Sequence, residues 1–292
     1  MNISSLDSSP RPNLSWTWNK DDPLWIAGPV VDAIASLLLM DDFQLAIDNT
    51  ATAAIPLDHL TGLRKFVVRG LLAPSVLGTL EEVIGNSPDL SHLVISVPDP
   101  STFLTSCMPF SKTLPPTSLP LRHLAVQASQ LDLNPICCHL IGLNSFNLEY
   151  SGLDDSVYLD LARAHPFCSR LIVHRVYPAL LNYLSQCSGT LQELSVLSLG
   201  DSNELAGRFW ATVLPEHTAT LHVLNICSEN ASEWCCSDQA IHAIMQCSQL
   251  RSLTLTVDPH STGRVRLTTH DHFEHDSDQG AFDKIVSISI IC

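Results

Sequence analysis

Residues 249–257 have the sequence QLRSLTLTV, in which leucines alternate with polar residues. Similar stretches occur at 89–97 (DLSHLVISV), 120–128 (PLRHLAVQA) and 190–199 (TLQELSVLSL). Alternation of this kind predicts a β-strand that buries one of its two faces. The recurrence of one pattern along a single chain predicts a fold built from repeated units.

The shared pattern is L-x-x-L-x-L, with Ile, Val, Phe or Cys allowed at the Leu positions. Eight copies and a probable ninth are found, namely Leu63/Phe66/Val68, Leu90/Leu93/Ile95, Leu121/Leu124/Val126, Leu143/Phe146/Leu148, Cys168/Leu171/Val173, Leu191/Leu194/Val196, Leu221/Leu224/Ile226, Leu250/Leu253/Leu255 and Ile285/Ile288/Ile290. Successive copies begin 22 to 35 residues apart. One copy has little weight, whereas a series with this period indicates a solenoid.

The segments between these copies have apolar residues at helical spacing. Helices are predicted within 75–84, 154–165, 177–187, 206–214 and 237–247. Each unit is therefore predicted to contain a strand, a turn, a helix and a return. Stacked units pair their strands edge to edge and bury the leucines in a continuous core. Because helices are wider than strands, the stack is expected to bend with the sheet on its concave side.

These repeats resemble the leucine-rich repeat family, and within it the long, ribonuclease-inhibitor-like type. The resemblance covers about residues 60–292. It implies an α/β fold, a horseshoe-shaped solenoid with a parallel concave sheet and outer helices. The turn after each strand lacks the repeated Asn or Cys of the family, so irregular turns are expected. The cysteine content and uneven period are similar to those of the C-terminal halves of fungal F-box/leucine-rich repeat proteins.

Three parts of the chain are predicted. Residues 1–23, rich in Ser, Pro and Asn, are predicted to be a flexible lead-in. Residues 24–60 are predicted to form a short helical N-terminal cap, with a helix that begins near Pro29. The start of this cap faintly resembles an F-box, so the cap is also a candidate F-box remnant. Residues 61–292 are predicted to be the repeat domain, with about nine irregular repeats.

Composition argues against several classes of protein. The net charge of −15 over 292 residues disfavours nucleic acid as a partner, because phosphate backbones are repelled. The apolar run at 24–40 is short for a membrane span and contains Asp32, so no membrane association is expected. The first residues do not resemble a secretory signal. An intracellular location, cytoplasmic or nuclear, is therefore expected, with the ten cysteines reduced.

Motifs that would indicate catalysis are missing from the sequence. We find no Walker loop, GxGxxG turn, GxSxG elbow or HRD-like set, so the chain is predicted not to be an enzyme and to need no cofactor. The one metal-like cluster is HDHFEHD, where His270, His272 and His275 are weak candidate ligands for Zn²⁺ or Ni²⁺. Because no rigid frame presets their geometry, we interpret this segment as a solvated loop. A metal-dependent enzyme is the third alternative.

The x positions of the strands are the candidate binding residues, because alternation turns them away from the core. Basic groups outnumber acidic ones among those of the first five repeats. The predicted partner-binding residues are Lys65, Arg69, His92, His123, Asn147, Glu149, Arg170, His174 and Glu193. The simpler interpretation is that exposed strand positions are merely polar. Our hypothesis is a docking groove for a segment of a protein partner, in particular an acidic one.

The predicted function is that of a protein–protein interaction scaffold. The F-box resemblance implies a more specific role, that of a substrate-recognition subunit of a cullin-type ubiquitin ligase. The linker protein of that ligase would then be a second partner. The alternative is a free-standing leucine-rich repeat inhibitor or signalling scaffold with no role in ubiquitin transfer.

Overall fold

The structure is a computed structural model. It describes residues 13–18, 27–36, 41–47, 56–70, 74–96, 119–127, 139–149, 155–164, 167–197, 202–227, 234–256 and 287–291. The chain divides into two compact units, Met1–Ala128 and Ser129–Cys292. The repeat pattern did not predict this division.

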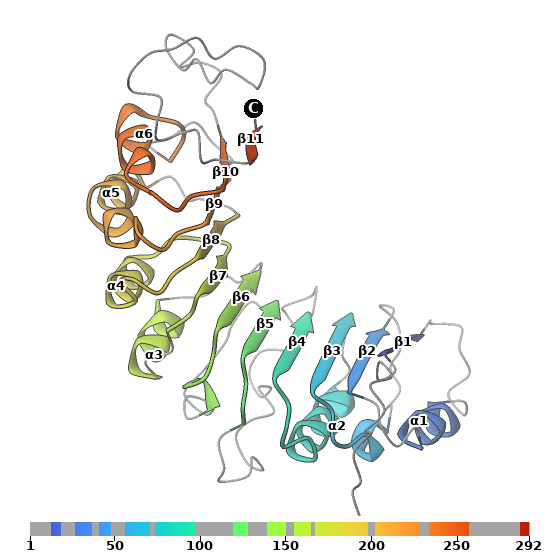
Figure 1. Ribbon diagram of the computed structural model, residues 1–292. Coiled ribbons are helices and arrows are strands. Elements are labelled where there is room, and N and C mark those ends of the chain that lie inside the picture. Colours follow the sequence, from blue (N-terminus) through green and yellow to red (C-terminus); the bar gives the residue numbers. More distant parts are fainter. Residues whose placement is uncertain are drawn as a thin grey trace, which may run out of the picture. The chain divides into compact units, whose positions relative to one another are not determined.

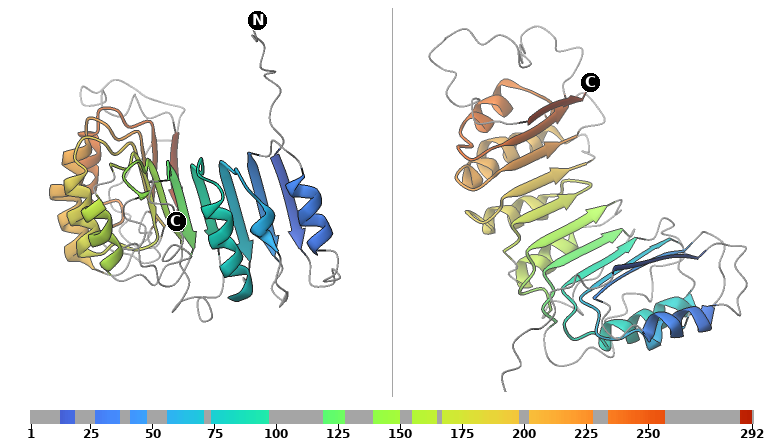
Figure 2. Two further views of the ribbon diagram at one scale, coloured as in Figure 1. Left: turned by 90° about the horizontal axis from the view of Figure 1, so that it is seen from below. Right: turned by 45° about the vertical axis from the view of Figure 1, so that its right-hand side comes forward.

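Unit 1 contains a parallel sheet with helices along one face (Figure 1, Figure 2). Its described strands are β1 (Asn13–Trp18), β2 (Asp42–Ile47), β3 (Lys65–Gly70), β4 (His92–Ser96) and β5 (His123–Gln127). Each strand pairs in parallel with the next one along the chain. The helical elements are α1 (Ala27–Ala35), the 3₁₀ turn η2 (Leu57–His59) and α2 (Pro74–Gly85).

Unit 2 has the same construction. Its described strands are β6 (Ser145–Glu149), β7 (Arg170–Val173), β8 (Glu193–Val196), β9 (Val223–Ile226), β10 (Ser252–Thr256) and β11 (Ser287–Ile291). They also pair in parallel and in chain order. The helices are α3 (Ser156–Ala164), α4 (Pro178–Gln186), α5 (Asn203–Arg208) and α6 (Asp238–Met245).

The predicted α/β architecture with a parallel sheet and outer helices is confirmed. Leu93 lies opposite Leu124 in unit 1, and Leu224 lies between Leu194 and Leu253 in unit 2. All five are buried, and complete burial of a leucine stabilises the fold by about 1.5–3 kcal/mol. The ninth copy of the pattern is also a strand, because Ile288 of β11 lies opposite Leu253. This arrangement is compatible with a solenoid.

The predicted helices are found, with one difference in form. Four of the five predicted segments coincide with α2, α3, α4 and α6 within a few residues. The segment predicted at 206–214 begins earlier, at Asn203, where the hydroxyl of Ser202 caps α5. The chain then continues as the π-helical turn η4 (Phe209–Val213) and the 3₁₀ turn η5 (Leu214–His217). The wider turn of a π-helix accommodates one extra residue per turn.

The predictions for the N-terminal region are wrong in two places. Residues 13–18 of the predicted lead-in form β1, and residues 42–47 of the predicted helical cap form β2. The helix predicted near Pro29 is confirmed as α1. The physical reason is that Phe43 continues the apolar row of the sheet: its ring stacks on Phe66 with centroids 6.2 Å apart. Unit 1 therefore has two strands before the first predicted repeat.

The described cysteines behave as small apolar side chains. Six of them form no disulfide bond, namely Cys168, Cys187, Cys227, Cys235, Cys236 and Cys247. Burial raises the pKa of Cys168 and of Cys247 to about 11, so both thiols stay protonated near neutral pH. Over the same described ranges, none of the helices combines the length and apolar character needed to cross a membrane.

Candidate functional site

The sheet face of unit 1 that lies away from the helices is organised in rows. Strands that pair in register bring equivalent residues side by side, about 4.8 Å apart. One row contains Asp42, Lys65, His92 and His123, contributed by β2, β3, β4 and β5. The structure therefore brings together three of the predicted binding residues, Lys65, His92 and His123.

Lys65 forms an ion pair that the sequence did not predict. Its Nζ donates a hydrogen bond to Oδ2 of Asp42 at 2.7 Å. The Asp42 side chain is only 11% exposed and that of Lys65 is 37% exposed, so the pair is partly shielded from water. The carboxylate offsets the charge of Lys65, and the face is less basic than predicted. Asp42 was missed because β2 was assigned to the helical cap.

A signal for β2 is nevertheless present in the sequence. Met40-x-x-Phe43-x-Leu45 fits the repeat pattern if Met is allowed at the first position. It begins 23 residues before Leu63, a distance within the range of the other repeats. A search that admitted methionine would have placed Asp42 beside Lys65.

The two histidines of the row are neighbours. The ring centroids of His92 and His123 lie 5.7 Å apart, with an angle of 32° between the ring planes. Burial lowers the pKa of His92, and the positive charge of Lys65 lowers it further. The neutral imidazole of His92 is therefore favoured near neutral pH.

Ser91 sets the orientation of the His92 ring. The Ser91 hydroxyl donates to the backbone oxygen of Arg64 at 3.1 Å. The hydroxyl oxygen of Ser91 also lies 2.9 Å from Nδ1 of His92. This contact uses Nδ1 of His92, so Nε2 is the ring nitrogen outside it.

Two further rows complete this face. The middle row is mostly apolar, with Val67, Val94 and Ala125 side by side. The third row contains Arg69, Ser96 and Gln127, in which the Ser96 hydroxyl donates to Oε1 of Gln127. Arg69 is exposed, and within the described parts of the chain no carboxylate forms an ion pair with it. Val67 and Ala125 are buried and Val94 is only partly exposed, so the middle row adds little exposed apolar surface between the two polar rows.

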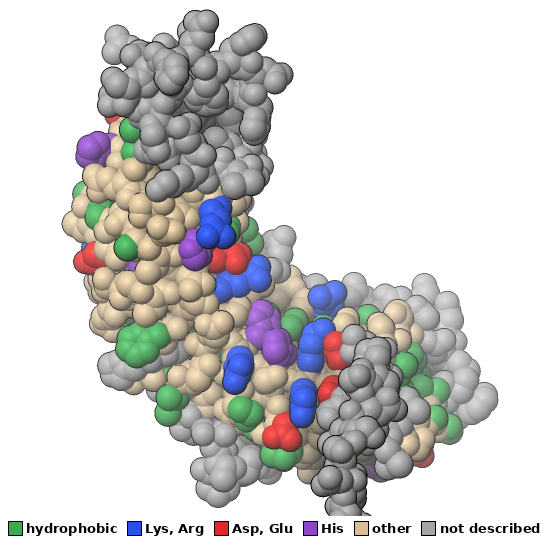
Figure 3. Space-filling model, in the orientation of Figure 1, with side chains coloured by type: hydrophobic (Ala, Val, Ile, Leu, Met, Phe, Trp, Pro, Cys, Tyr) green, Lys and Arg blue, Asp and Glu red, His purple; other side chains and the backbone are tan. Residues whose placement is uncertain are grey.

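Figure 3 shows the charged and histidine side chains on the drawn face. Lysine, arginine and histidine side chains gather over the region of β3 to β5, and acidic side chains are fewer there. The exposed arginines of the described turns, Arg64 and Arg122, directly precede Lys65 and His123 in sequence. Arg64 lies 3.8 Å from a carboxylate oxygen of Asp41, so within the described residues Arg69 and Arg122 are the arginines of this region without an ion pair.

The predicted residues of unit 2 do not form a comparable basic surface. Arg170 on β7 is paired with Glu193 on β8, with 3.1 Å between Nε and Oε1. Asn147 lies opposite Ile172, and His174 directly follows β7. Glu149 is the last residue of β6, but its side chain lies outside the described part of the structure. The cations and anions of this face offset one another.

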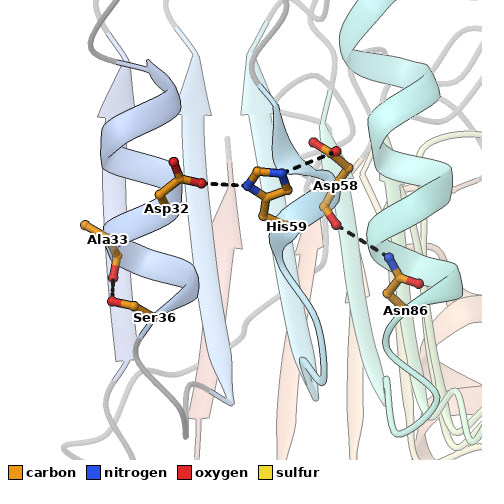
Figure 4. Close-up of polar contacts among 6 residues, drawn as sticks. All are labelled: Asp32, Ala33, Ser36, Asp58, His59 and Asn86. Carbon is orange, nitrogen blue, oxygen red and sulfur yellow. Dashed lines mark hydrogen bonds and ion pairs between the residues drawn. The ribbon is translucent and has the colours of Figure 1, made fainter.

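A second polar cluster lies on the helical side of unit 1 (Figure 4). Nδ1 of His59 lies 2.6 Å from Oδ1 of Asp32 on α1, and its Nε2 lies 3.7 Å from Oδ2 of Asp58. Asn86, at the end of α2, donates to the backbone oxygen of Asp58 at 3.5 Å. The hydrogen bond to Asp32, and then the charge of Asp58, raise the pKa of His59. The cluster links α1, η2 and α2, a role that the sequence did not predict because its members are about one repeat apart.

This cluster lacks an activated nucleophile. The nearby Ser36 hydroxyl donates to the backbone oxygen of Ala33 at 2.7 Å, within its own helix. A nucleophilic serine would need a hydrogen bond to the imidazole instead. We interpret the cluster as a connection between helices.

A cluster of metal-binding side chains would be another kind of functional site. In the described ranges, no group of three or more His, Cys, Asp or Glu side chains could hold a metal ion. The weak candidates His270, His272 and His275 lie outside the described residues.

Comparison with known proteins adds no family to this description. No protein-family model matches the chain, and a search of the curated proteins finds no match. A function for the chain is therefore inferred from its own geometry.

Proposed function

We propose that the chain is a non-enzymatic protein-interaction scaffold of the leucine-rich repeat class, which binds an acidic segment of a protein partner on the sheet face of β2 to β5. The observation that carries this proposal is the row formed by Lys65, His92 and His123, with Arg69 on the same face. These side chains come from three neighbouring strands, so one extended segment can contact them together.

The leucine-rich repeat assignment is supported by the match between pattern and strands. Copies of L-x-x-L-x-L coincide with β3 to β10, and their buried positions lie opposite one another. Strands that pair in chain order, each separated by about one repeat length, are the arrangement that this class requires.

Charge complementarity supports an acidic partner. The chain as a whole carries a net charge of −15 and repels acidic segments over most of its surface. Arg69 and Arg122, for which the described parts of the chain show no ion pair, supply positive charge near the face of β3 to β5, whereas Lys65 and Arg64 are offset by Asp42 and Asp41. Complementary charge of this kind directs a partner to one surface and increases the association rate.

The sheet also reduces the cost of binding. Backbone hydrogen bonds between paired strands fix the spacing of the side chains before a partner arrives. Little additional ordering of the scaffold is then needed on association. Binding by a preorganised face needs no chemical step, in agreement with the missing catalytic motifs.

Within this class we favour a free-standing scaffold over an adaptor of a cullin-type ubiquitin ligase. An F-box-like module needs residues 24–60 to form a helical domain. Residues 42–47 are instead the strand β2, paired with β1 and β3. The ligase role is the second candidate, and it rests on the family resemblance of the repeats.

An intracellular location is part of the proposal. The six described cysteines form no disulfide bond, the state expected in a reducing compartment. The cytoplasm and the nucleus both provide that environment.

The proposed surface can be tested with matched pairs of variants. A partner is first captured by chemical cross-linking and identified by mass spectrometry, and its affinity is then measured by isothermal titration calorimetry. Lys65→Gln/Arg69→Gln removes two positive charges from the proposed face. The control, Arg175→Gln/Arg251→Gln, removes two positive charges from exposed positions in unit 2.

The face variant is expected to bind at least ten-fold more weakly and to depend less on salt, because the carboxylates of the acidic segment lose their positively charged counterparts. The control is expected to bind like the unmodified chain. Equal affinities for all three proteins would reject the proposed face.

The ligase alternative has its own test. The purified linker protein of a cullin-type ligase is immobilised, and binding of the full chain is measured by surface plasmon resonance. We expect no specific binding. A saturable interaction that is lost when α1 is altered would favour the adaptor role instead.

A further inference from the structure

We propose that His92 and His123 form a binding site for a divalent transition-metal ion, such as Ni²⁺, Cu²⁺ or Zn²⁺, on the exposed face of β4 and β5. The site is separate from the histidine cluster at 270–275. It uses side chains of the proposed docking face, but metal binding to the free chain does not depend on a protein partner.

The spacing of the two rings fits a shared ion. His92 and His123 are register partners on neighbouring parallel strands, with ring centroids 5.7 Å apart. Two imidazoles that share one ion through bonds of about 2.0–2.1 Å place their centroids roughly 5–6 Å apart. The centroid separation of His92 and His123 falls within this range.

The hydrogen bonds around His92 leave the correct atom for coordination. Nδ1 lies 2.9 Å from the Ser91 hydroxyl oxygen, and Ser91 in turn donates to the backbone oxygen of Arg64. In the tautomer in which Nδ1–H donates to Ser91, the lone pair of the ring is on Nε2. Histidines that bind metal ions usually donate their other N–H to such a partner, which fixes the ring orientation.

A histidine ligand coordinates through one of its two ring nitrogens, and His123 is the register partner of His92. Its side chain is half-exposed and that of His92 is exposed, so an ion can reach both from solvent.

The positive charges of Lys65 and Arg122, which lower the pKa of His92, are each partly compensated. Lys65 is the neighbour of His92 in the row, but its charge is offset by Asp42 through their 2.7 Å ion pair. Arg122 is exposed to solvent, which screens its charge. Imidazole is a preferred ligand of nickel, copper and zinc, whereas magnesium and calcium prefer oxygen ligands.

The site has two protein ligands, because no group of three or more ligating side chains is found among the described residues. Water completes the coordination in the free chain. If the proposed function holds, a carboxylate of a docked acidic segment is a suitable replacement for one of these waters, since carboxylates also bind such ions.

The test is a titration of the full chain with Ni²⁺ by isothermal titration calorimetry at pH 7.5. To exclude the second histidine cluster, all proteins carry His270→Gln, His272→Gln and His275→Gln. This background protein is expected to bind one equivalent of Ni²⁺. His92→Gln and His123→Gln are each expected to weaken binding at least ten-fold, whereas the control His222→Gln leaves it unchanged.

The Ser91→Ala variant tests whether metal binding needs the orientation of the His92 ring and not only its exposure to solvent. Removal of such a supporting hydrogen bond typically weakens metal binding about 10- to 100-fold, so a loss of about ten-fold is expected, with an unchanged circular dichroism spectrum. The proposal is overturned if the background protein binds no Ni²⁺, or if the His92→Gln/His123→Gln double variant binds one equivalent with unchanged affinity.

Discussion

Single buried leucines hold neighbouring strands of this chain together. Leu224 is fully buried and lies between Leu194 and Leu253 in the sheet of unit 2. Its side chain therefore contacts two neighbouring repeats, and a truncation leaves a cavity between them. Polar residues on the opposite face of the same strands do not fill the core. Substitutions of the leucines should therefore change stability, whereas substitutions of the polar residues should change binding.

Leu224→Ala is expected to lower the free energy of unfolding by about 2–5 kcal/mol, from lost burial and the cavity left behind. Urea denaturation followed by circular dichroism measures this change. The control is Ile141→Ala, because Ile141 is 68% exposed and should change stability by less than about 0.5 kcal/mol. Similar losses for the two variants would contradict the assignment of Leu224 to the core.

His217 is a buried histidine whose titration affects stability. Its ring lies 3.1 Å from the backbone oxygen of Leu184 through Nε2, while Nδ1 is buried without a hydrogen-bond partner in the described structure. Burial is the main cause that lowers the pKa of His217 below its ordinary value of 6.5. The folded state therefore binds this proton less readily than the unfolded state.

The sign of the pH effect follows from this difference. Above pH 6.5 the ring is neutral in both states and its stability contribution is complete, and that contribution is lost as the pH falls towards the folded pKa. His217→Gln keeps a donor for Leu184 and is expected to reduce the loss of stability between pH 7 and pH 5. The two states differ by at most one bound proton at this site. The slope of the free energy of unfolding against pH therefore decreases by no more than about 1.4 kcal/mol per pH unit. Urea denaturation at several pH values measures it, and an unchanged slope would contradict this role.

At the scale of elements, the strands were predicted best where the repeat pattern was regular. The positions of β3 to β10 follow from leucine alternation, because one-face burial imposes a period of two. β1 and β2 were missed because Trp16, Trp18 and Met40 do not fit a pattern written for Leu and its small variants. The π-helical turn at Phe209–Val213 was missed because it is stabilised by tertiary packing of Phe209, Trp210 and Trp234, which no local pattern reports.

Part of the candidate site was also predicted from the alternation of residues along the strands. Period-two alternation places Lys65, His92 and His123 on one face, as the structure confirms. The pairing of Lys65 with Asp42 and the orientation of His92 by Ser91 depend on contacts between strands. These contacts depend on which residues of neighbouring strands lie opposite one another. That register could not be predicted for Asp42, because its strand β2 was not recognised in the sequence.

Helix α6 depends on its N-terminal cap. The hydroxyl oxygen of Ser237 accepts a hydrogen bond from the backbone N–H of Ala240 at 3.2 Å. Ser237→Ala is expected to lower the free energy of unfolding by about 1 kcal/mol, because this N–H loses its partner. Ser237→Asp restores an acceptor and is expected to retain most of the stability. Thermal denaturation of both variants measures the effect, and equal losses would contradict the cap.

At the scale of the whole molecule, most interactions join each repeat to its neighbours along the chain. Every strand pairing described within a unit links consecutive strands. The stability of such an array is approximately a sum of local terms. Damage in one repeat should therefore affect nearby repeats most.

Leu93→Ala is expected to loosen β3, β4 and β5 more than β8 to β10, because Leu93 is buried between the strands of unit 1. Hydrogen–deuterium exchange with mass spectrometry reports this strand by strand. Leu224→Ala is the reciprocal control and should loosen unit 2 most. Uniform loss of protection in both variants would indicate one cooperative body and contradict the local picture.

The central claim is that consecutive repeats pair as parallel strands in one register, which places Lys65, His92 and His123 in a row. Oxidative cross-linking of cysteine pairs, mapped by mass spectrometry, tests it most directly. Lys65→Cys/His92→Cys joins register partners and is expected to form a disulfide, because bridged Cα atoms lie about 4.4–6.8 Å apart. Lys65→Cys/Ser96→Cys is offset by four residues, or about 13 Å, and is expected not to cross-link. Cross-linking of the offset pair without the register pair would contradict the account.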